Sequence, residues 1–176
     1  KTYKKVGNIQ KSKEWFIEGA KYMNTYYGQL AFTEIYPNES FSLEDLPKVT
    51  KEYEKKFRKH PLIKTIKILH ELDRTKYTKD IIKHLALLDI EKGSEILAGK
   101  LAIEIGRYDY AIQISKKASY EKRFYNQLNY PVIRTPNIVN QKAMPKPELI
   151  LSVIRQESEF DRKANSSVGA RGMMQL

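Results

Sequence analysis

The sequence predicts an all-α protein, and three observations carry this prediction. Apolar residues recur three and four positions apart along most of the 176 residues, whereas the alternation typical of a β-strand is scarce. Prolines and glycines interrupt this pattern at intervals suited to short helices. Hydrophobic residues make up 41% of the chain, which is enough to bury a core, and no uninterrupted apolar run is long enough to span a membrane.

Three amphipathic helices are expected in the N-terminal part of the chain, each with one apolar face. The apolar positions of the first are Trp15, Phe16, Ala20, Met23 and Tyr27. Those of the second and third are Val49, Tyr53 and Phe57, then Leu62, Ile66 and Leu69. The third helix should begin at Pro61, because the fixed φ of proline suits a first helical turn.

Three further helices follow in the middle of the chain. Thr78 is expected to cap the first of them at its N-terminus, since a threonine hydroxyl can accept a free backbone N–H. The apolar positions of this helix and the next are Ile81, Ile82, Leu85 and Leu88, then Ile96, Leu97, Leu101, Ala102 and Ile105. Gly106 should end the second of the three in a left-handed conformation, and the third should begin at Tyr108.

Helices of about ten residues cannot each bury an apolar face alone. We therefore expect antiparallel helix hairpins that stack into a superhelical array. The stretch Gly-Arg-Tyr-Asp-Tyr-Ala-Ile at 106–112 is typical of a tetratricopeptide-type turn and second helix, although no regular repeat period accompanies it. We assign residues 1–140 to this helical region.

A domain boundary is expected near the C-terminal fifth of the chain. Four of the seven prolines fall there, at Pro131, Pro136, Pro145 and Pro147. Such spacing favours an extended connection, and an ordered loop packed on the array is the alternative. We therefore predict a second domain over residues 141–176.

A helix opened by Pro147 would carry an acid on its apolar face. Ile150 and Ile154 recur at helical spacing, and Glu157 and then Phe160 continue the same face. Glu157 is either a solvated residue near a helix end or a functional acid. Because burial disfavours a charged carboxylate, an inward Glu157 would stay protonated near neutrality and could donate its proton.

The run from Arg155 to Gln175 closely resembles the signature of soluble lytic murein transglycosylases. It contains Arg-Gln-Glu-Ser-Glu-Phe, followed by Ala-Asn-Ser-Ser-Val-Gly-Ala-Arg-Gly-Met-Met-Gln at 164–175. The resemblance implies the truncated start of a lysozyme-like catalytic domain, preceded by a superhelical linker domain. The stretch Tyr-Tyr-Gly-Gln-Leu-Ala at 26–31 resembles a motif of that linker.

The resemblance also implies roles for individual residues. Glu157 would be the catalytic residue, and Ser166 and Gln175 would line the sugar groove. The residues that shape the loop around this groove would be Gly169, Ala170, Gly172 and Met174.

The chemistry of that family requires a single acid. The bond between N-acetylmuramic acid and N-acetylglucosamine is cleaved without water, because the muramic 6-hydroxyl attacks its own anomeric carbon. Glu157 would act first as general acid and then as base, giving a 1,6-anhydro product. Asp161 is expected to bond nearby backbone amides at the helix end, and Arg155 to form structural ion pairs.

Two other functions remain open. A goose-type, lysozyme-like hydrolase would use the same Glu157 with water as the nucleophile. A non-catalytic helical-repeat scaffold would bind murein or partners without cleaving them. The helical region is compatible with the scaffold, whereas the Glu157 motif argues against it.

Composition bears on partners and cofactors. The net charge of +11 favours a polyanion, and peptidoglycan carries lactyl and peptide carboxylates. No nucleic-acid-binding signature is present, and the three histidines lack metal-ligand spacing, so we expect neither nucleic acid, metal nor cofactor. The family implies the bacterial periplasm, and we expect a monomer. Because the chain begins with Lys1 and stops after Leu176, we expect a fragment with little activity alone.

Overall fold

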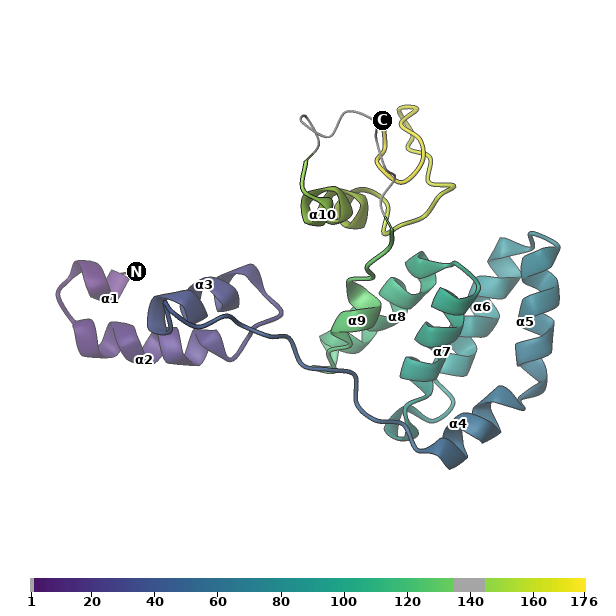
Figure 1. Ribbon diagram of the computed structural model, residues 1–176, viewed down its shortest axis with the longest axis horizontal. Helices are drawn as coiled ribbons and strands as arrows, with labels where there is room; N and C mark the ends of the chain where they lie inside the picture. Colours follow the sequence, from purple (N-terminus) through teal and green to yellow (C-terminus); the bar gives the residue numbers. More distant parts are fainter. Residues whose placement is uncertain (1, 135–144) are drawn as a thin grey trace. The chain divides into compact units, whose positions relative to one another are not determined.

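The computed structural model describes residues 2–134 and 145–176, and all regular secondary structure within them is helical. The predicted all-α fold is confirmed. The helices are α1 (Thr2–Lys5), α2 (Ile9–Ala20), α3 (Tyr26–Ile35), α4 (Lys51–Arg58), α5 (Pro61–Glu71), α6 (Thr75–Ala86), the 3-10 helix η1 (Ile90–Lys92), α7 (Ser94–Glu104), α8 (Tyr108–Tyr120), α9 (Asn126–Asn129) and α10 (Pro147–Glu157). The chain forms two compact units, Lys1–Asp45 and Leu46–Leu176, and Figure 1 traces both.

In the first unit, the prediction of a single helix from Trp15 to Tyr27 is wrong. Helix α2 ends at Ala20, and α3 begins at Tyr26. Thr25 causes the restart, because its hydroxyl accepts the N–H of Gly28 at 3.0 Å and donates to the carbonyl of Tyr22 at 2.9 Å. The apolar residues on the two sides of this cap have the spacing of one helical face, and for this reason the sequence predicts a single helix.

Gly28 lets the first turn of α3 lie directly against the preceding turn. A Cβ atom at this position would lie 1.9 Å from the carbonyl oxygen of Tyr22, which is a backbone atom and cannot rotate away. Helices α2 and α3 also approach closely at Gly19, where a Cβ would lie 3.2 Å from that of Ala31. Small residues therefore set the packing of this unit.

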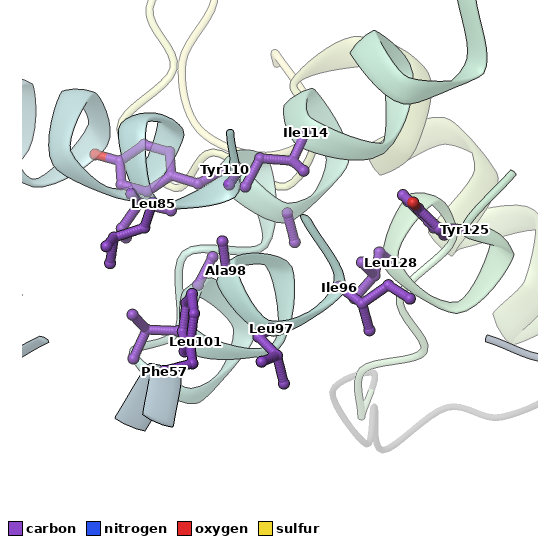
Figure 2. Packing of buried hydrophobic residues seen from close by; sticks show 14 of the residues in the cluster. Phe57, Leu85, Ile96, Leu97, Ala98, Leu101, Tyr110, Ile114, Tyr125 and Leu128 are labelled. Atoms are coloured by element: carbon purple, nitrogen blue, oxygen red, sulfur yellow. The ribbon is translucent and has the colours of Figure 1, made fainter. Parts of the chain in front are cut away.

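The second unit is built around α7. Each helix from α5 to α9 contacts the next one along the chain, and α6 also contacts α8. Figure 2 shows side chains of α7 with those of neighbouring helices in this core. The buried members of the core are Tyr53, Phe57, Ile66, Ile82, Leu85, Ala86, Ile96, Leu97, Ala98, Leu101, Ala102, Tyr110, Ala111, Ile114, Ala118, Tyr125 and Leu128.

Most helix ends in this unit follow the sequence signals. Pro61 opens α5, α8 begins at Tyr108, and Gly106 adopts a left-handed φ of 74° after α7. Thr78 is not an N-cap. Helix α6 begins three residues earlier, at Thr75, and the buried Thr78 hydroxyl donates to the Arg74 carbonyl at 3.0 Å. A threonine inside a helix can make this bond as readily as a capping bond, so residue type alone did not separate the two.

A buried carboxylate joins α7 to the segment after α8. Glu95 is 2% exposed, and its two oxygens accept hydrogen bonds from Nε and Nη2 of Arg123 at 2.9 and 3.0 Å. The Tyr125 hydroxyl donates to the same carboxylate at 2.9 Å. With these partners Glu95 is compensated, as a buried charge must be.

Helix α8 also has a second buried side. Ile112 packs there with Ile154 of α10 and with Phe160 beyond it. Residues 46–176 therefore form one compact unit. The predicted domain boundary at residues 140 and 141 lies outside the described residues and stays a prediction, as does the superhelical arrangement.

The Gly28→Ala variant tests the close approach in the first unit. The new methyl would collide with the Tyr22 carbonyl, and overpacking of this kind costs about 1–3 kcal/mol. We expect faster amide hydrogen exchange throughout α2 and α3, with residues of the second unit unchanged. Thr33→Ala, at an exposed position of α3, is the control. Unchanged exchange in the Gly28→Ala variant would contradict the described turn.

Two buried tyrosines predict alkaline destabilisation of the second unit. Burial raises the pKa of Tyr110 and of Tyr125 from 10.0 to about 12, and for Tyr125 the bond to Glu95 adds to this effect. An unfolded chain would ionise them near pH 10 while the folded chain keeps them neutral. The contribution of the neutral tyrosines to the free energy of unfolding is therefore fully present below pH 10. It is lost as the pH rises towards about 12.

Denaturant titrations across this pH range measure the decline. Tyr125→Phe should make it shallower, whereas Tyr120→Phe should leave it unchanged, since Tyr120 is 84% exposed. An identical pH dependence in wild-type and Tyr125→Phe proteins would refute the assignment.

Candidate active site

Helix α10 carries the candidate catalytic acid at its last residue. Pro147 occupies the first turn, as the sequence predicts, and Glu148 adds a negative charge where the helix dipole is positive. Ile154 is buried at 5% exposure, and Ile150 is half-buried against the same small core. This apolar face holds α10 to α8 and so fixes where its C-terminal end lies.

The chain turns sharply after α10. Ser158 donates its backbone N–H to the Ile154 carbonyl at 3.1 Å, and the next two residues, Glu159 and Phe160, have left-handed φ values of 53° and 67°. The turn brings Phe160 into the core, where it is 3% exposed and its ring centroid lies 6.2 Å from that of Tyr108. Phe160 therefore completes the apolar face of α10.

The expected burial of Glu157 is wrong. Glu157 is exposed, because the helix ends at this residue and Phe160, rather than Glu157, turns inward. Its carboxylate has neither a hydrogen bond nor an ion pair with any residue in the described part of the chain. The structure thus presents an accessible acid with no structural partner in residues 2–134 and 145–176.

The glycine-rich segment after α10 forms a small hairpin-like loop. Asn165 and Arg171 form an isolated antiparallel β-bridge. Inside it, the Ser166 N–H donates to the Ala170 carbonyl, and the Ala170 N–H donates to the Ser166 hydroxyl oxygen, both at 2.9 Å. Gly169 closes the turn with a φ of 98°. Ser166 therefore already acts in shaping this loop.

A second turn follows at Gly172. Its φ is 72°, and its N–H donates to the Ala164 carbonyl at 2.8 Å. The side-chain nitrogen of Gln175 donates to the Gly172 carbonyl at 2.7 Å, while Met174 stays exposed. A Cβ at Gly169 or Gly172 would meet no atom within 4 Å, so backbone conformation, not space, demands glycine at both positions.

Ser158 attaches this loop to α10, a role that residue spacing did not reveal. Its hydroxyl lies 2.7 Å from the Met173 carbonyl and 3.3 Å from that of Ile154. The shorter contact is the better hydrogen bond. Ser158 follows Glu157 directly, so the bond holds the loop beside the acid. In the sequence, only the position of this serine directly after Glu157 in the motif could have indicated this role.

Arg155 and Glu159, the charged residues on either side of Glu157, both have partners. Arg155 donates from Nε to the Asn129 carbonyl at 2.8 Å and from Nη2 to Asn129 Oδ1 at 2.6 Å. Glu159 lies 3.8 Å from Nη1 of Arg155 and accepts from Lys116 at 2.5 Å. The structural role expected for Arg155 is confirmed.

Asp161 likewise has structural partners. Its Oδ1 atom accepts the backbone N–H of Lys163 at 3.0 Å, as expected for a short acid after a helix end. The same oxygen lies 4.0 Å from Nη2 of Arg107, which also forms a two-bond pair with Asp109 at 2.9 and 2.7 Å. These contacts separate Asp161 from the unpartnered Glu157.

Neither a metal site nor a membrane span is found in the parts that the structure describes. Across these residues, no three His, Asp or Glu side chains gather closely enough to hold a metal ion. No helix in residues 2–134 or 145–176 is both long enough and apolar enough to cross a membrane.

Residues 135–176 match a protein family described as the Transglycosylase SLT domain. The match includes α10 and the whole loop after it, and the helices before residue 135 lie outside it. The family consists of lytic-transglycosylase-type, lysozyme-like enzymes that break glycosidic bonds of peptidoglycan outside the cytoplasm. No curated protein sequence matches the chain. The matched segment is the one that contains the Glu157 motif.

Ser158→Ala tests the attachment of the loop to α10. Loss of the bond to Met173 should destabilise the loop by about 1 kcal/mol and speed amide exchange over residues 172–175. Ser152→Ala is a matched control, because the Ser152 hydroxyl bonds only the Glu148 carbonyl within α10, at 2.5 Å. Equal effects of the two substitutions on the loop would contradict this role.

Proposed function

We propose that this protein is a lytic transglycosylase that cleaves the bond between N-acetylmuramic acid and N-acetylglucosamine in peptidoglycan and forms 1,6-anhydro-N-acetylmuramic acid. The observation that carries the proposal is Glu157, an exposed acid without a partner among the described residues, in a segment that matches the Transglycosylase SLT domain. The catalytic domain would begin near residue 141, after a helical region over residues 1–140.

Glu157 would act twice on one substrate. Its carboxylic acid gives a proton to the glycosidic oxygen as the bond to the anomeric carbon breaks, and the N-acetylglucosamine leaves with a free hydroxyl. The resulting carboxylate then takes the proton of the muramic 6-hydroxyl while that oxygen bonds to the anomeric carbon. Glu157 ends protonated as it began, and no water is consumed.

The exposure of Glu157 supports access by a polymeric substrate. A glycan strand that lies over the end of α10 would itself exclude water from the carboxylate, and electrostatic interactions strengthen when water leaves. The apolar surroundings expected from the sequence would then come from the bound substrate rather than from Ile154 or Phe160.

Ser166 and Gln175 would bind the sugar through polar atoms that are not used in the hydrogen bonds of the loop. The Ser166 hydroxyl accepts from Ala170, so its own proton is available for a sugar oxygen. Gln175 uses its side-chain nitrogen on Gly172, which leaves its carbonyl oxygen free to accept. Gly169, Ala170, Gly172 and Met174 would shape the loop that presents these two groups.

Hydrolysis is the second candidate, and one observation favours it: water can reach an exposed Glu157 as easily as a sugar can. An ordinary hydrolase needs a second carboxylate as nucleophile or base. Glu159, two residues beyond Glu157, is bound by Lys116. Asp161, four residues beyond Glu157, is held by Lys163 and Arg107. The engagement of both supports the reaction that needs only one acid.

A peptidoglycan substrate implies a location outside the cytoplasm, and we propose the bacterial periplasm. The net charge of +11 suits an anionic polymer such as peptidoglycan. The expectation of a monomer stays a prediction.

Glu157→Gln in the full-length protein tests the proposal. The variant should bind peptidoglycan but cleave it at least about a hundredfold more slowly, since general acid–base catalysis contributes about 10²–10⁴-fold. Because Glu157 is exposed and has no ion pair with any described residue, the melting temperature should not change. Glu148→Gln, exposed at the other end of α10, is the control and should retain activity.

The products distinguish the candidates. Mass spectrometry should find 1,6-anhydromuropeptides from the wild-type protein. Muropeptides with a reducing end would support the hydrolase instead, and binding without any cleavage would support the scaffold. Full activity of the Glu157→Gln variant would exclude Glu157 as the catalytic acid.

A further inference from the structure

A groove of about 320 Å³ lies between α6 and α8, on the same unit as Glu157. Its apolar lining includes Ala86, Leu87 and Ile114. Lys83 of α6 and Lys117 of α8 also line it, with Tyr120 at the end of α8. The volume falls within the range of pockets that bind small molecules, about 300–1,000 Å³.

Two of the three lysines that line this groove have no paired anion among the described residues. Neither Lys83 nor Lys117 forms an ion pair or a hydrogen bond with any residue in the described part of the chain. The one carboxylate that lines the groove, Glu95, is already bound by Arg123 and Tyr125. Within the described residues, the charges of Lys83 and Lys117 therefore have no ion-pair partner.

The electrostatic surroundings of Lys83 agree with this geometry. Burial lowers its pKa below the ordinary 10.5, and the positive charges of Lys79 and Lys117 lower it further, whereas Asp80 acts in the opposite direction. A bound anion would relieve this repulsion.

A contact connects the groove with the candidate active site. Lys116, which also lines the groove, donates to Glu159 at 2.5 Å. Glu159 lies in the turn directly after α10, two residues beyond Glu157. The wall of the groove therefore contacts the turn that directly follows Glu157.

We propose that the groove between α6 and α8 binds the carboxylate-bearing part of a muramoyl peptide, with Lys83 and Lys117 pairing its carboxylates and the apolar lining contacting its methyl groups. Tyr120, which is 84% exposed, offers its ring face to a sugar. The inference rests on the proposed function, and it names a binding site outside the segment that matches the Transglycosylase SLT domain.

Nucleic acid suits this groove less well, although it is also an anion. Proteins that hold single strands stack successive bases on a series of aromatic side chains. The groove is lined by one aromatic residue, Tyr120. Its three lysines around an apolar lining fit a compact anion with apolar groups better than a phosphate backbone.

Calorimetry with the full-length Glu157→Gln protein tests the inference, since this variant should bind without cleaving. The probes are a muramoyl dipeptide, which carries carboxylates, and di-N-acetylglucosamine, which is neutral. The muramoyl dipeptide should bind more tightly, and its affinity should fall as salt increases. Lys83→Gln and Lys117→Gln should each weaken binding about three- to tenfold, as for loss of one charged contact.

Lys64→Gln is the matched control, because Lys64 is an exposed lysine of α5 that does not line the groove. It removes the same charge and should leave the affinity unchanged. An equal loss in all three variants would show that only net charge matters and would overturn the proposal. So would equal affinity for the neutral probe, or tight binding of a single-stranded RNA oligonucleotide at the groove without binding of the dipeptide.

The two proposals fail in different ways. A wild-type protein that binds the dipeptide through Lys83 and Lys117 but never cleaves peptidoglycan would contradict the proposed function. The proposal that the groove binds a muramoyl peptide would stand. Conversely, the Lys83→Gln, Lys117→Gln double variant could keep an unchanged affinity for the dipeptide while peptidoglycan is still cleaved to anhydro products. That result would contradict only the proposed binding role of the groove.

Discussion

Burial of helix α8 on two sides is the constraint on which the second unit depends. One side joins the main core through Tyr110, Ile114 and Ala118, and the other meets α10 through Ile112. Each large apolar side chain buried in this way contributes about 1.5–3 kcal/mol. A helix with one apolar face would pack against the main core alone. Because α8 has two buried sides, it also holds α10 and thereby fixes the position of the candidate catalytic acid.

Polar contacts then select Glu157 from its charged neighbours. Arg155 is bound to Asn129, Glu159 to Lys116, and Asp161 to a backbone amide and, at longer range, Arg107. Each of these residues has a structural task that explains its presence. Glu157 has none in the described part of the chain, and an acid without a structural partner at an accessible helix end is suited to act on a substrate.

Much of the fold could be predicted because some residues act locally. Pro61 and Pro147 open helices where expected, and Gly106 ends one, since each residue restricts or permits particular backbone angles by itself. Thr78 was assigned the wrong role, and the cap at Thr25 was not predicted. A threonine hydroxyl bonds a nearby backbone group both at a helix start and inside a helix, so its role depends on where the neighbouring turns lie.

The sequence by itself determined the helical class, several helix ends and the motif that identifies Glu157, because periodicity, proline, glycine and residue order are local properties. Only the tertiary structure decided that Glu157 is exposed while Phe160 is buried, since that depends on the turn after α10 and its packing on α8. The same holds for the groove. Lys83 and Lys117 are distant in sequence, and they line one groove only because α6 and α8 pack together.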